Sequence, residues 1–129
     1  MPTFFRGVNT VAAVAVSERR SGPVTVLGLE GDVTFGAGTA TLRRETRRLI
    51  AEGRPDILLD LARVRYVDSS GLGEMVAAQL AARRAGGRVA LLAPTPNVLE
   101  VFEMTQLVQV FDIYADEAGA LRGMAAGRD

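Results

Sequence analysis

The chain has 129 residues, 48% of them hydrophobic and 23% charged, which is typical of one globular domain with a buried core. Fifteen acidic residues balance fifteen arginines, so no overall charge attracts nucleic acid or an anionic membrane. Histidine, cysteine and lysine are absent, which excludes a Ser-His-Asp relay, a lysine nucleophile and the usual zinc ligands. We therefore expect a protein that is not an enzyme, with no catalytic residue, no metal site and no cofactor.

The chain has no apolar run of about 18 residues, so membrane insertion is not expected. The apolar stretch 11–16 is followed by Ser17-Glu18-Arg19-Arg20 and not by a small-residue cleavage site, so it predicts a strand and not a signal peptide. Because cysteine is absent, nothing indicates an oxidising compartment. We expect a cytoplasmic protein.

The first predicted unit is a β-hairpin. Residues 1–7 are expected to form a loose start. Runs rich in β-branched residues at 8–16 and 24–29 predict two strands, and Ser21-Gly22-Pro23 between them predicts the turn.

A loop and a helix are expected next. The segment 31–38 is rich in glycine and threonine and predicts a loop. Thr39 or Thr41 is a candidate cap for a helix that runs to about Glu52. One side of this helix carries four arginines, for which a solvated face is favoured over a binding stripe for an acidic partner: Arg43, Arg44, Arg47 and Arg48.

The second half of the chain alternates strands and helices. The predicted elements are a buried strand at 56–60 that ends at Asp60, a helix at 70–85 closed by Gly86-Gly87, a strand at 88–92, a short helix capped by Asn97, a strand at 108–114 and a helix at 116–124. In the helix at 70–85, the apolar spacing predicts four inward-facing residues: Leu72, Met75, Val76 and Leu80.

This order of elements predicts an α/β fold, in which a mixed, mostly parallel sheet follows from an opening hairpin and carries packed helices. One domain is expected over 1–129, with its core at about 8–124. In such folds functional groups collect where strands end and helices begin. The segments 31–38 and 68–73 are both at such places.

The segment 68–73 reads Asp68-Ser69-Ser70-Gly71-Leu72-Gly73. Aspartate and serine are good helix caps, and a helix start also has free amides that attract an anion. The residues alone leave a cap and a functional site about equally favoured. Asp32 lies near these serines if the two loops converge, and is otherwise an ordinary turn aspartate.

Four stretches of the chain match the pattern of a known family: Asp56-Ile57-Leu58-Leu59-Asp60-Leu61, Val67 with the segment 68–73, Asn97-Val98 through Met104-Thr105-Gln106-Leu107, and Phe111-Asp112-Ile113-Tyr114. On these residues the chain resembles a STAS domain of the bacterial anti-sigma factor antagonist type. The resemblance implies a STAS fold. Departures from the family pattern are Thr34 in place of a usual acidic residue, the glycine-rich Phe35-Gly36-Ala37-Gly38, and Gln106 in place of a common glycine.

The resemblance also implies a function. Ser69 would be phosphorylated by a partner serine kinase that is itself an anti-sigma factor, and a phosphatase would reverse this. The unphosphorylated chain would bind the kinase and free the sigma factor, which regulates transcription without direct contact with nucleic acid. The expected partner-binding residues are Asp32, Asp68, Ser70, Gly71, Leu72 and Gly73.

Two alternatives stay open at this point. The first is a STAS binding module without a switch, such as a cytosolic subunit of a lipid-transporting ABC complex or a component of a signalling scaffold. The second is nucleotide binding at the segment 68–73, which has neither a lysine nor P-loop spacing to support it.

Overall fold

The computed structural model describes residues 4–6 and 14–126. In chain order the elements are β1 (Phe4–Arg6), β2 (Val14–Ser21), β3 (Val24–Val33), α1 (Ala37–Ala51), β4 (Asp56–Val67), α2 (Ser69–Arg84), β5 (Arg88–Leu92), α3 (Pro96–Met104), a short 3-10 helix η1 (Leu107–Gln109), β6 (Ile113–Tyr114) and α4 (Glu117–Ala126). Within the described ranges, no helix is both long enough and apolar enough to cross a membrane.

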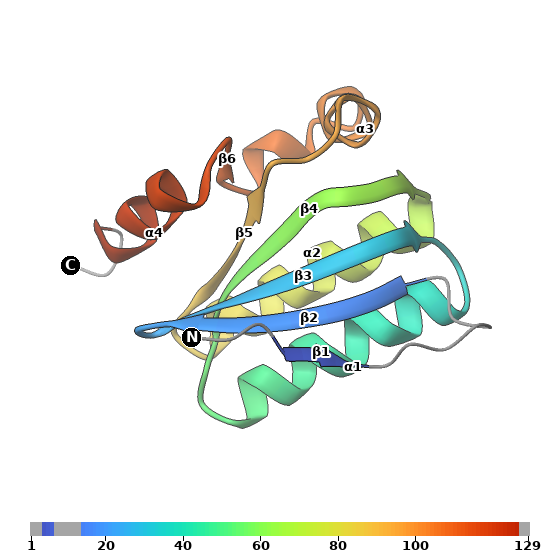
Figure 1. Cartoon of the computed structure of the whole chain (residues 1–129). Helices are drawn as coiled ribbons and strands as arrows, with labels where there is room; N and C mark the ends of the chain where they lie inside the picture. The colour runs from blue at the N-terminus through green and yellow to red at the C-terminus, as the bar shows by residue number, and fades with distance from the viewer. Residues whose placement is uncertain (1–3, 7–13, 127–129) are drawn as a thin grey trace.

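The strands form one sheet in sequence order, from β1 to β6 (Figure 1). The pairs β1–β2 and β2–β3 are antiparallel, and the three following pairs are parallel. The expected α/β class, with an opening hairpin and a mixed, mostly parallel sheet, is confirmed. The hairpin turn lies where it was predicted, with Gly22 at φ 58°.

Helices cover both faces of the sheet. The larger core lies between one face and the helices α1, α2 and α3, and its most buried members include Leu42, Met75 and Phe102. The smaller core lies under α4 on the opposite face. An ion pair adds to the attachment of α4, because Arg19 of β2 donates to Glu117 at 2.8 Å.

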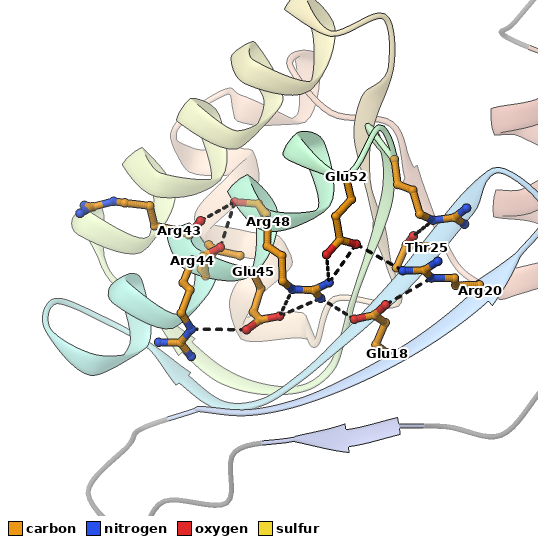
Figure 2. Close-up of polar contacts among 11 residues, drawn as sticks. Glu18, Arg20, Thr25, Arg43, Arg44, Glu45, Arg48 and Glu52 are labelled. Carbon is orange, nitrogen blue, oxygen red and sulfur yellow. Dashed lines mark hydrogen bonds and ion pairs between the residues drawn. The ribbon is translucent and has the colours of Figure 1, made fainter.

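A cluster of charged residues fastens α1 to β2 (Figure 2). Arg48 donates to Glu18 of β2 at 2.5 Å and to Glu45 of its own helix at 3.0 Å, and it also bonds Glu52. Partial burial acts to lower the pKa of Arg48, but the hydrogen bonds to Glu45 and Glu18 outweigh it and raise this pKa. The interpretation of four solvated arginines is therefore wrong for Arg48, whose side chain is 26% exposed.

The N-terminal part differs from the prediction in two ways. A short strand, β1, lies within the expected loose start, and it pairs with β2. Most of the run predicted as a strand at 8–16 is outside the described residues, whereas Val14 to Val16 lie in β2. β2 continues to Ser21, beyond the predicted end.

Both strands that lead to the segments 31–38 and 68–73 are longer than predicted. β3 continues through Val33 and β4 through Val67, so the loop after β3 is short and Asp60 lies inside its strand. Register shifts interrupt their pairing, and in β4 the buried residues Leu61, Val64 and Val67 recur every third position. The usual sequence signal of a strand is alternation with period two, and this part of β4 lacks it.

Helix caps were also misassigned. α1 begins at Ala37, before both Thr39 and Thr41. α3 is capped by Thr95, whose Oγ1 accepts the Val98 N–H at 3.4 Å, and Asn97 lies inside the helix. Pro96 explains the second error, because proline favours the first helical position and so moves the cap to the residue before it.

Four other outcomes concern the second half of the chain. Gly86 ends α2 with φ 88°, and β5 has the predicted bounds. Leu80 is 52% exposed, so its predicted inward orientation is wrong. The strand predicted at 108–114 is limited to Ile113–Tyr114, because η1 occupies most of the segment before it.

Candidate functional site

Ser69 is the first residue of α2 and is exposed to solvent. It follows β4 directly, with only Asp68 between strand and helix. The first amides of a helix have no partners within it, and the peptide dipoles place partial positive charge there. An anionic group attached to the Ser69 hydroxyl would therefore lie in a favourable field.

Asp68 holds the Ser69 loop together. Its Oδ1 accepts the Gly71 N–H at 2.8 Å, which caps α2, and its Oδ2 accepts the Phe35 N–H at 2.9 Å. The Asp68 N–H donates in turn to the Val33 carbonyl at 3.4 Å. The N–H groups of Phe35 and Gly71 lower the pKa of the Asp68 carboxyl below its usual value. Asp68 thus joins the end of β3 to the start of α2.

Glycines let both helices press against the last residues of β3. A Cβ on Gly71 would lie 2.1 Å from the Val33 carbonyl oxygen, and a Cβ on Gly38 of α1 would lie 2.5 Å from the Asp32 carbonyl oxygen. Gly73 differs, because a Cβ there would have no atom within 4 Å. Gly71 is therefore required by packing, and Gly73 faces open space.

The start of α1 forms the other half of the site. Gly36 occupies the cap position with φ 106°, and its N–H donates to Thr39 Oγ1 at 3.2 Å. Thr39 also donates its own N–H to the Thr34 carbonyl at 3.1 Å. Phe35 lies between these anchored residues, and its side chain is 82% exposed.

Asp32 lies near the end of β3, where it pairs in register with Tyr66. Its carbonyl oxygen faces Gly38, and its carboxylate forms an ion pair with Arg65 at 3.3 Å. The next residue, Val33, is the one whose carbonyl meets Asp68 and Gly71. The loops after β3 and β4 therefore converge, and the Asp32 side chain is engaged by Arg65.

The remaining residues singled out from the sequence divide by burial. Ser70 is half-buried and Gly73 is exposed, whereas Leu72 is only 8% exposed and packs in the larger core.

Sequence reasoning missed Phe35 as a member of the site. The only signal was the unusual loop around it, because its bond to Asp68 spans 33 positions. Among the described residues, no group of three or more acidic side chains is arranged to hold a metal ion.

Known proteins share this architecture. The family model for the STAS domain matches residues 15–120. The anti-sigma-B factor antagonist of Bacillus subtilis is 30% identical over 84 residues, which cover 65% of this chain and 77% of that protein.

Two solved structures share the fold. The first, an anti-sigma factor antagonist from Mycobacterium paratuberculosis, has a TM-score of 0.79 at 19% identity, over 92% of this chain and 99% of that one. The second is the Bacillus cell fate determinant SpoIIAA in its phosphorylated form. Its TM-score is 0.62 at 21% identity, over 94% of this chain and 97% of that one.

Proposed function

This chain belongs to the STAS domain family, and on that premise we propose that it is an anti-sigma factor antagonist switched by phosphorylation of Ser69. The unphosphorylated chain binds an anti-sigma factor that is also a serine kinase, and so releases a sigma factor. A phosphatase restores the binding form. The chain acts as the substrate of these enzymes and supplies no catalytic group of its own.

The observation that carries the proposal is the placement of Ser69 as an exposed hydroxyl at the start of α2, on a loop that Asp68 fixes. A phosphate adds about −1.5 to −2 charges at neutral pH. The helix start stabilises such a charge in the folded chain. At an interface, the same charge would lose its water and lie beside the Asp68 carboxylate. Modification can therefore end binding while the fold is kept.

A pull-down from the source organism tests the proposal. The wild-type chain is the bait in one arm, and Ser69→Asp and Ser69→Asn are the baits in the other two. We expect the wild type to recover an anti-sigma factor, identified by mass spectrometry, and Ser69→Asp to lose it. Ser69→Asn is the matched control and should still recover the anti-sigma factor, because asparagine has nearly the size of aspartate without its charge.

Direct phosphorylation gives a second readout. The recovered anti-sigma factor is incubated with ATP and either wild type or Ser69→Ala, and the modified residue is located by mass spectrometry. Phosphate at Ser69 of the wild type and none on Ser69→Ala is the expected result. Equal binding of all three baits, with no phosphate on Ser69, would instead favour a STAS module that binds its partner without a switch.

A further inference from the structure

Phe35 is an aromatic side chain displayed on a fixed backbone. Of the described residues, it has the most exposed of the large apolar side chains, at 82%. Its N–H is bound by Asp68, and the N–H of the next residue is bound by Thr39. A side chain on a backbone that is already ordered loses little conformational freedom when it binds a partner. Aromatic side chains, phenylalanine included, are enriched in the cores of protein interfaces.

The residues around Phe35 indicate what kind of partner surface would bind its side chain. Gly36 and Ala37 follow it in the chain and are both exposed, so the phenyl ring stands beside residues with little or no side chain. The nearby Asp68 carboxylate already accepts two amide hydrogens. The phenyl ring itself is an uncharged aromatic knob, and its complement is an apolar pocket.

The Phe35 loop is also linked to Ser69, through Asp68. Asp68 directly precedes Ser69 in the chain, and the same carboxylate binds the Phe35 N–H at 2.9 Å. A partner that covers the Ser69 hydroxyl therefore approaches the Phe35 loop as well.

We propose that Phe35 anchors the interface with the anti-sigma factor by inserting into an apolar pocket of that protein, with Asp68 as the residue that positions it. This inference rests on the proposed function and names the contact through which it works. It also predicts that a single phosphate would have a large effect on binding. A phosphate on Ser69 would have to lose its water next to an apolar contact, where burial of charge is most unfavourable.

The test is calorimetric titration with the anti-sigma factor identified in the pull-down, after its purification. We expect Phe35→Ala to raise Kd about 30-fold or more, equivalent to about 2 kcal/mol. Its melting temperature should stay within about 2 °C of the wild type, because a side chain this exposed contributes little to folding. Met104→Ala is the matched control, since Met104 is another exposed apolar residue at 77%. It should change Kd by less than about threefold.

Each outcome has a separate meaning. Wild-type affinity in Phe35→Ala, or an equal loss in Met104→Ala, would overturn the role of Phe35 while leaving the proposed function intact. Failure of the wild type itself to bind the anti-sigma factor would overturn both.

A double-mutant cycle tests the positioning role of Asp68. Asp68→Asn can accept only one of the two amide hydrogens, so we expect weaker binding and faster hydrogen exchange at the Phe35 amide. If Asp68 acts through Phe35, the variant with both Phe35→Ala and Asp68→Asn binds no more weakly than Phe35→Ala alone. Strictly additive losses would contradict this role.

Discussion

The helices α1 and α2 follow adjacent parallel strands and both press against the end of β3, yet they are fixed differently. α2 has its own side-chain cap in Asp68. α1 has a glycine, Gly36, at its cap position. The Phe35 N–H just before it donates to the same Asp68, and Arg48 fastens the helix to β2. The difference shows that the Ser69 loop is the more self-contained junction. The Phe35 loop depends on it.

The shared residue Asp68 determines how the chain would respond to a modification at Ser69. A change that moves Asp68 would release two structures, the first turn of α2 and the backbone of Phe35. The ion cluster around Arg48 involves α1 and β2, so it should hold α1 in place when its first turn loosens. The four substitutions that follow separate these contributions.

The largest effect is expected from Gly71→Ala, which tests the close approach of α2 to β3. The added Cβ would lie 2.1 Å from the Val33 carbonyl oxygen, so backbone must move. We expect a loss of about 3 kcal/mol in the free energy of unfolding, measured by urea denaturation. Gly73→Ala is the control, and it should be neutral or stabilising by up to about 1 kcal/mol because its site is open. Equal losses in both variants would contradict the packing argument.

Arg48→Met tests the attachment of α1. The variant keeps most of the aliphatic side chain and removes the guanidinium that binds Glu18 and the nearly buried Glu45. Because the cluster is only partly buried, we expect about 2 kcal/mol of destabilisation, less than for a fully buried pair. The exposed neighbour Arg47 gives the control, since Arg47→Met should change stability by less than about 0.5 kcal/mol. Similar values for the two variants would show that the cluster contributes little.

Asp68→Ala tests the cap that both junctions share. Loss of a helix cap and of the bond to Phe35 should destabilise the chain by about 1.5 kcal/mol at pH 7. Because the folded state lowers the pKa of Asp68, its contribution is present above the unfolded value of about 4 and is lost as pH falls through the lower folded value. Unfolding titrations from pH 7 to pH 2 should therefore show wild type and variant converging in acid. A gap that stays constant would exclude the carboxylate as its source.

Thr39→Val should give the smallest effect, about 0.5–1 kcal/mol, because it removes only the hydroxyl that bonds Gly36. Differential scanning calorimetry measures it, with Thr41→Val as a control at a similarly buried position inside α1. A loss as large as that of Asp68→Ala would mean that α1 starts on its own contacts and does not depend on α2.

The sequence by itself determined the fold class and indicated where the candidate site lies. Strands that alternate with helices, the turn at Gly22-Pro23 and the stop at Gly86 are local signals, and each is found in the structure. The family pattern around Ser69 is also contiguous in the chain, so it could be recognised without a fold. The absence of histidine, cysteine and lysine needs only composition.

Only the tertiary structure decided how the two loops are joined. The double role of Asp68, the close approach of Gly71 to Val33 and the link between Arg48 and Glu18 connect residues that are about 30 or more positions apart. Local propensity carries no information about such distances. The ends of β3 and β4 were missed for a related reason. Register shifts arise from the pairing of the two strands, and they interrupt the alternation that a regular strand would show in its sequence.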